Sequence, residues 1–179
     1  GAGNDTLDGG AGDDWFDPGS GNQDVVIGGA DTDIMVVDRR AETAVTKAKS
    51  FATLPVNPFV DGTTLAVEGV EKTVILAGSG NDDLNFASIT STDVVGLYGN
   101  DGNDYLRGGA GHDNSNTIVT EWWRSPTGQN IAGGLYGGAG NDTLDGGAGD
   151  DWFDPGSGNQ DVVIGGADTD IMVVDRRAE

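Results

Sequence analysis

A nine-residue pattern rich in glycine and aspartate recurs along the chain and limits the folds available to it. It is plainest where residues 137–145 read GGAGNDTLD and residues 146–154 read GGAGDDWFD. Glycines at the first, second and fourth positions let the backbone take positive φ and turn tightly, so that carbonyl oxygens converge on one point. Units that recur at a fixed short period bury their apolar residues by stacking on their neighbours. The pattern therefore predicts a stacked repeat architecture.

Two longer repeats are built from this unit. Residues 96–113 match residues 134–151 at 13 of 18 positions, so two nonapeptides behave as one coil. Residues 1–42 recur without a change as residues 138–179, which sets a period of 137 residues. The second copy follows Gly137, which completes its first nonapeptide, whereas the first copy starts inside that nonapeptide. We therefore expect the chain to be part of a longer tandem array.

The composition points to cations held by oxygen ligands. The chain has 32 glycines among 179 residues, 25 of its 30 acidic residues are aspartates, and its formal net charge is −21. Short carboxylates on glycine turns suit hard divalent cations, whereas an acidic helix surface usually mixes glutamate with aspartate. So acidic a chain lacks the basic stripe that nucleic acids require. It has no cysteine for disulfides or thiolate metal sites, and no run approaches the roughly 18 apolar residues of a membrane span.

The nonapeptide resembles the motif of the RTX (repeats-in-toxin) haemolysin-type calcium-binding family, G-G-x-G-x-D-x-U-x with U a large apolar residue. The resemblance implies an all-β fold, namely a right-handed parallel β-roll, or β-solenoid, of two nonapeptides per coil with non-repeat insertions. It also implies several Ca2+ ions as cofactors, each between turns of successive coils, and secretion before folding. The candidate calcium ligands are Asp5, Asp14, Asp24, Asp33, Asp82, Asp101, Asp104, Asp113, Asp142, Asp151, Asp161 and Asp170.

Ligands shared between successive coils should lie about 18 residues apart, because calcium takes 6 to 8 oxygens and one turn supplies too few. Four pairs of motif aspartates are separated by 19 residues: Asp5 with Asp24, Asp14 with Asp33, Asp142 with Asp161, and Asp151 with Asp170. The extra residue falls in an irregular loop, such as residues 155–161. The spacing therefore agrees with ions held between coils.

A short strand should follow each turn, with its central side chain inward because alternate side chains face opposite sides of a sheet. The expected inward residues are Leu7, Phe16, Leu84, Leu106, Leu144 and Phe153. One apolar residue per nonapeptide makes a thin core, which offsets little of the conformational entropy of so many glycines. We therefore expect the chain to be largely disordered without calcium and to fold when the ions bind.

The chain divides into five segments. These are residues 1–42, a roll; 43–76, an insertion and then strands; 77–113, degenerate coils; 114–133, an insertion with tryptophans; and 134–179, a roll that begins the next period. Residues 43–49 fit a short helix or a loop. Residues 65–76 are rich in β-branched side chains and predict strands, and residues 93–95 indicate a degenerate coil.

Three functions remain open. The favoured one is a calcium-dependent extracellular structural protein whose tandem periods form a fibre, stalk or adhesin shaft. The second is a carboxy-terminal secretion and folding module of an exported enzyme or toxin, which the resemblance permits. The third is a glycan-binding adhesin module that uses Trp122 and Trp123, although packing of these indoles on the roll is the simpler interpretation. Trp15 and Trp152 should point outward.

The sequence gives no sign of catalysis, and we expect that the protein is not an enzyme. His112 is the single histidine and has no recognisable Ser or Cys nucleophile as a partner, so it is interpreted as a solvated turn residue. The expected partners are neighbouring repeats of the same array, with lateral or end-to-end self-association. No nucleic acid and no membrane span are expected. The expected location is secreted, extracellular or at the cell surface.

Overall fold

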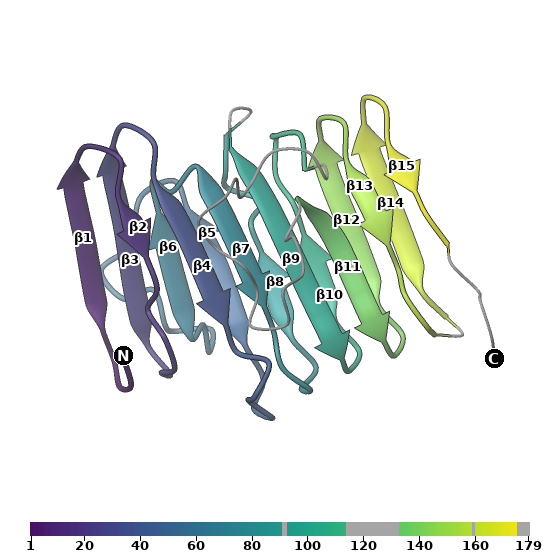
Figure 1. The fold of residues 1–179 in the computed structure, drawn as a ribbon, viewed down its shortest axis with the longest axis horizontal. Coiled ribbons are helices and arrows are strands. Elements are labelled where there is room, and N and C mark those ends of the chain that lie inside the picture. The colour runs from purple at the N-terminus through teal and green to yellow at the C-terminus, as the bar shows by residue number, and fades with distance from the viewer. Residues whose placement is uncertain (91–92, 114–132, 159, 175–179) are drawn as a thin grey trace.

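Two parallel β-sheets face each other along the whole length of the molecule (Figure 1). The computed structural model describes residues 1–90, 93–113, 133–158 and 160–174, which form strands and no helix. The first sheet has eight strands in the order β1 (Thr6–Ala11), β3 (Asp24–Ala30), β6 (Leu65–Glu68), β5 (Lys47–Phe51), β8 (Asp83–Asn85), β10 (Tyr105–Arg107), β12 (Thr143–Ala148) and β14 (Val162–Ala167). The second has seven, in the order β2 (Trp15–Phe16), β4 (Ile34–Asp38), β7 (Lys72–Leu76), β9 (Val94–Asp101), β11 (Gly134–Ala139), β13 (Trp152–Asp154) and β15 (Ile171–Met172). The expected all-β parallel roll is confirmed.

Equivalent residues of successive coils lie directly over one another. Leu106 of β10 is in register with Leu84 of β8 on one side and with Leu144 of β12 on the other, and all three side chains are fully buried. Each nonapeptide therefore contributes one residue to a continuous apolar row between the sheets. The other expected inward residues, Phe16 and Phe153, are buried as well, and Leu7 is partly buried against the same core.

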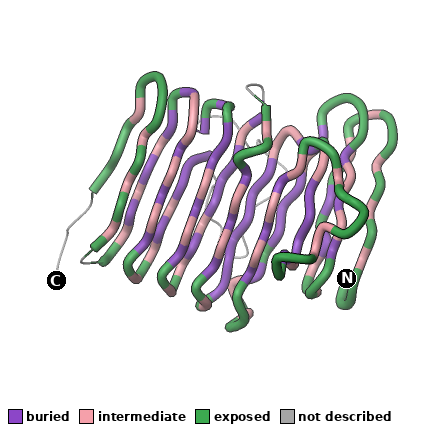
Figure 2. Tube along the Cα trace, turned by 180° about the vertical axis from the view of Figure 1, so that it is seen from behind, coloured by how far each residue is buried: buried purple, intermediate pink, exposed green. Residues whose placement is uncertain are grey.

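The core is not uniform along the roll, as the buried segments in Figure 2 show. In the coils that carry glycine motifs, about one large apolar side chain per nonapeptide is buried. Residues 24–77 bury a denser set: Val26, Met35, Val36, Val37, Ala48, Leu65, Ala66, Val67, Val70, Val74, Ile75, Leu76 and Ala77. This part of the roll is held mainly by apolar packing.

The order of strands in the first sheet departs from simple winding. After β4 the chain forms β5, which lies between β6 and β8, and only then returns to form β6 next to β3. Residues 47–49, within the segment left open between helix and loop, are thus the start of a strand. The strands expected in residues 65–76 and the degenerate coil at residues 93–95 are present as β6, β7 and the start of β9.

The expected insertion of residues 114–133 lies outside the described residues except for Gly133, and Trp122 and Trp123 with it. Of the other tryptophans, Trp15 is exposed and Trp152 is half-buried, as expected for outward positions on strands. Among the described residues, no helix is long and apolar enough to cross a membrane.

Candidate calcium ladders

Two rows of aspartates follow the turns of the roll. The first ladder, at the start of strands in the eight-stranded sheet, consists of Asp5, Asp24, Asp82, Asp104, Asp142 and Asp161. The second ladder, on the side of the seven-stranded sheet, consists of Asp14, Asp33, Asp113, Asp151 and Asp170. Each aspartate holds the sixth position of a nonapeptide, directly after the glycine turn. The stacking of coils therefore brings carboxylates of neighbouring turns together.

One carboxylate oxygen of each pair links two coils through the backbone. The N–H group of Asp104 donates to Oδ1 of Asp142 at 2.9 Å, and that of Asp113 donates to Oδ1 of Asp151 at 3.0 Å. The same bond joins the four pairs that are 19 residues apart, together with Asp82 and Asp104. The structure thus brings together the pairs expected from their spacing. It adds pairs 22 and 38 residues apart, because non-repeat residues separate those coils in the sequence.

The second oxygen of most ladder carboxylates is buried and, within the described part of the chain, makes no hydrogen bond. This holds for Oδ2 of Asp5, Asp14, Asp33, Asp82, Asp104, Asp113, Asp142 and Asp151. A buried carboxylate oxygen without a partner costs free energy, because it has lost its water and gained nothing in exchange. A row of such oxygens fits a bound cation.

The electrostatics of the ladders agree with this interpretation. Burial, together with neighbouring carboxylates, raises the pKa of Asp104 and of Asp151 to about 7 and that of Asp113 to about 8. Burial also raises the pKa of Asp33 and Asp142 above the ordinary value of 3.8. Without a counterion, Asp104, Asp113 and Asp151 therefore titrate near neutral pH and bind protons there. A divalent cation would instead keep them ionised and balance the charge of two of them at once.

Glycine allows the turns to approach the ladder carboxylates and the neighbouring coil closely. A Cβ added at Gly137, the first motif position, would lie 2.6 Å from Oδ2 of Asp142. Gly140, at the fourth position, has a φ of +141° and lies so close to the carbonyl oxygen of Gly102 that a Cβ would collide with it. Backbone carbonyls and carboxylates therefore face a common turn, and such all-oxygen ligand sets are preferred by calcium.

Two predicted ligands are placed differently from the rest. Asp101 occupies the third position of its nonapeptide at the end of β9, and its side chain is exposed. Asp24 is fully buried, but its Oδ2 accepts a hydrogen bond of 2.9 Å from the guanidinium of Arg39. Asp161 and Asp170 are partly buried and accept the last link of each ladder through Oδ1.

Some ladder positions are filled by residues that the sequence analysis did not single out. The N–H group of Asp33 donates to Oε2 of Glu71 at 2.8 Å, so Glu71 continues the second ladder. In the first ladder, the N–H group of Thr46 donates to Oδ1 of Asp82. Glu71 could have been found from its position directly before the strand of residues 72–76, because ladder aspartates also directly precede strands.

A second, exposed row of side chains caps the same turns at the fifth motif position. The N–H group of Asp150 donates to Nδ1 of His112 at 2.8 Å, and that of Thr169 donates to Oδ1 of Asp150 at 2.9 Å. Asn81 and Asn103 accept equivalent bonds in neighbouring coils. His112 is therefore one member of a hydrogen-bonded row on the surface of the turns.

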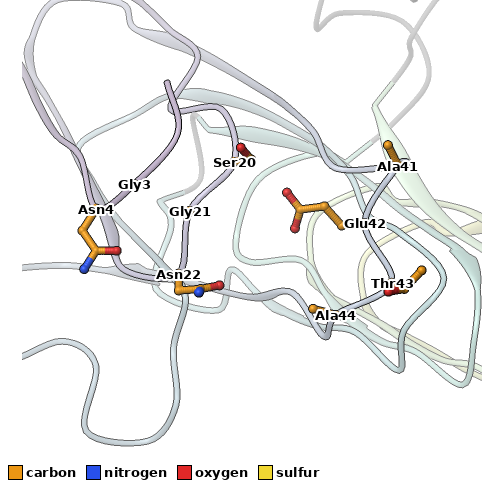
Figure 3. Close-up of a pocket in the computed structure, with 9 residues that line it drawn as sticks. All are labelled: Gly3, Asn4, Ser20, Gly21, Asn22, Ala41, Glu42, Thr43 and Ala44. Carbon is orange, nitrogen blue, oxygen red and sulfur yellow. The ribbon is translucent and has the colours of Figure 1, made fainter.

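A hollow of about 500 Å³ lies beside the first turns of the roll, between residues 3–4, 20–22 and 41–44. Figure 3 shows the Glu42 side chain directed from the 41–44 loop towards the turn that carries Ser20 and Gly21. Glu42 is the single carboxylate among the lining residues, whereas a ladder link such as that between Asp104 and Asp142 brings two aspartates together. We assign no ion to this hollow.

Comparison with known proteins agrees with the geometry. The model of the RTX calcium-binding nonapeptide repeat matches the chain in four copies, over residues 1–22, 97–114 and 135–159. These ranges contain six of the ladder aspartates: Asp5, Asp14, Asp104, Asp113, Asp142 and Asp151. No curated protein and no solved structure matches the chain. The chain is a calcium-binding repeat protein that carries RTX nonapeptide repeats.

Proposed function

We propose that the chain is a segment of a calcium-dependent extracellular array whose tandem periods form a fibre, stalk or adhesin shaft. The observation that carries the proposal is the sequence identity of residues 1–42 and 138–179, whose described parts lie at opposite ends of the same roll (Figure 1). Because the two copies have different neighbours, the strand pairings of each copy support the proposed extension at the opposite end of the roll.

The strand at the carboxy-terminal edge of the first sheet has a duplicate that is paired on both sides within the chain. Strand β14 ends the first sheet, but its duplicate β3 pairs with β6 through a register that joins Val26 to Val67. The burial of the last coil changes accordingly: Met35 in β4 is 0% exposed, whereas its duplicate Met172 in β15 is 54% exposed. A further period that paired with this edge would bury Met172 as Met35 is buried in the first copy.

The strands at the amino-terminal edges of the two sheets also have duplicates that are paired on both sides. Strand β1 begins the first sheet, whereas its duplicate β12 pairs with β10, where Leu144 is in register with Leu106. Strand β2 likewise begins the second sheet, whereas its duplicate β13 pairs with β11. Both ends of the roll can thus be extended by strand pairings that already exist in the molecule.

Calcium is the proposed condition for this assembly. The ions would be held by the ladder aspartates with Oδ2 buried and unpaired, together with backbone carbonyls of the glycine turns. Ion binding then supplies folding free energy to coils with thin apolar cores. RTX repeat proteins are typically exported, and millimolar calcium outside the cell would fold the roll where it acts. No residue is assigned a catalytic role.

The proposal is tested by comparing this chain with a variant extended by one further 137-residue period, in calcium and in chelator. From β1 to β12 the first sheet advances six strands, and from β2 to β13 the second advances five. At a strand spacing of about 4.8 Å, the contour of the folded particle should grow by roughly 24–29 Å in small-angle scattering. Two bodies that tumble independently, or full β-structure in chelator by circular dichroism, would contradict it.

A further inference from the structure

Asp24 differs from the other buried ladder aspartates in the partner of its second oxygen. In eight ladder residues Oδ2 is buried without a hydrogen bond, within the residues that the structure describes. In Asp24 the same atom lies 2.9 Å from a guanidinium nitrogen of Arg39, and the two side chains are 0% and 2% exposed. A positive charge of the chain itself therefore occupies the place where the other carboxylates face a cation site.

Arg39 is held in this position by the fold. It follows β4, and its N–H group donates to the carbonyl oxygen of Leu76 at 2.8 Å, which continues the pairing of β4 with β7. Its side chain follows the inward alternation of Met35 and Val37, which are both fully buried. An inward position on a strand thus directs a cation into the roll, towards the first ladder.

The surroundings of Asp24 explain why one charge suffices. On one side its neighbour in the sheet is β1 with Asp5, and on the other side it is in register with Leu65, which is buried and apolar. On the Leu65 side no aspartate is in register with Asp24, whereas Asp104 is linked to an aspartate in the coils on both of its sides. A monovalent guanidinium neutralises one carboxylate, while a divalent ion there would be left with excess positive charge in a low dielectric.

We propose that Arg39 is a built-in cation that replaces calcium at Asp24, so that residues 24–77 pack without an ion at this end of the first ladder. The inference rests on the proposed calcium ladders. The dense apolar core of residues 24–77 supports it, because this segment depends least on ions for its packing. The first ladder resumes at Asp82, beyond β6 and β5.

The experiment counts calcium ions per chain by equilibrium dialysis and follows protection of residues 24–77 by hydrogen exchange in chelator. Arg39→Ala should bind one more ion per chain than the parent, and in chelator it should lose the protection of residues 24–77. Calcium should restore that protection. Arg40→Ala is the matched control, because Arg40 is the next residue and pairs with Asp38 at the surface. It should leave both the ion count and the protection unchanged.

Each outcome decides between the two proposals. A parent chain that binds no calcium contradicts the proposed function, whereas a parent that binds calcium and an Arg39→Ala variant with the same ion count and protection overturns the role of Arg39. If Arg39→Ala does not fold even in calcium, the Arg39→Lys variant tests whether a positive charge is required beside Asp24. A folded Lys variant with the parent's ion count supports a required cation, and an unfolded one overturns it.

Discussion

Gly140 stacks on the carbonyl oxygen of Gly102 with no room for a side chain between them. Its exact sequence duplicate, Gly3, has a similar φ of +122° but nothing within 4 Å of the place where a Cβ would be. The two glycines differ in their neighbours and not in their local sequence. Paired substitutions in residues 1–42 and 138–179 therefore separate the effect of stacking from that of local conformation.

The first prediction concerns these two glycines. Both have positive φ, so alanine should cost about 1 kcal/mol at either position through backbone strain. At Gly140 the added Cβ also forces neighbouring coils apart, and we expect a further loss of roughly 1–3 kcal/mol. Denaturant unfolding in saturating calcium measures both variants. Equal losses for Gly3→Ala and Gly140→Ala would show that the close stacking of coils does not stabilise the roll.

The second prediction concerns the apolar row. Leu144 is fully buried between coils, whereas its duplicate Leu7 is only partly buried in the terminal coil. Leu144→Ala should lower the free energy of unfolding by about 2–5 kcal/mol. Leu7→Ala should lower it by clearly less, because part of its surface is already in water. The same unfolding measurement checks the pair, and a larger loss at Leu7 would contradict the burial.

The third prediction compares two adjacent aspartates. Asp151 is buried in the second ladder with Oδ2 unpaired, whereas Asp150 is exposed and caps a turn through Oδ1. Asp151→Asn keeps the link to Asp113 and removes a charged ligand, so it should weaken calcium binding by about 10-fold or more. Asp150→Asn should change it little. Calcium titrations followed by circular dichroism measure both, and equal midpoints would remove Asp151 from the set of ligands.

The fourth prediction concerns pH. In the metal-free folded chain the pKa of Asp104 and Asp151 is raised to about 7 and that of Asp113 to about 8, above the ordinary value of 3.8. The folded chain therefore binds protons more tightly than the unfolded chain, so this contribution to stability is complete below pH 4 and is lost as pH rises through 7 to 8. Metal-free protein should become more ordered as pH falls from 8 to 5.

Calcium should reverse the sign of this dependence, because the ion binds the ionised carboxylates and competes with protons. The calcium concentration at the midpoint of folding should fall as pH rises from 5 to 8. Circular dichroism at fixed pH values measures both trends on one sample. Calcium midpoints that do not change with pH would show that the buried ladder carboxylates are not the ligands.

The coils that carry complete nonapeptides could be predicted from sequence because their structure is local. The turn, the aspartate and the inward residue lie within nine positions, so the inward rows and the coil-to-coil pairs follow from the motif. The position of β5 could not be predicted in this way. Lys47–Phe51 contains neither a glycine turn nor a long apolar run, and its place between β6 and β8 depends on pairings with residues far along the chain.

The ion pair of Asp24 with Arg39 could not be predicted from the nonapeptide motif either. The nonapeptide pattern treats every sixth-position aspartate alike, whereas the partner of Asp24 comes from outside any motif. The available signal was the alternation of Met35, Val37 and Arg39, which places a cation at an inward position after two buried apolar residues. Conversely, Asp101 lies near the motif in sequence but on the exposed side of its strand.

The strand inserted into one sheet has a consequence for shape. Between equivalent coils the first sheet advances six strands and the second only five, so one face of each period is wider by about 4.8 Å across a sheet separation of about 10 Å. A unit with unequal faces is a wedge of roughly 25–30°. Identical wedges placed in tandem trace an arc, so in the proposed array a single intercalated strand would set the curvature of the whole filament.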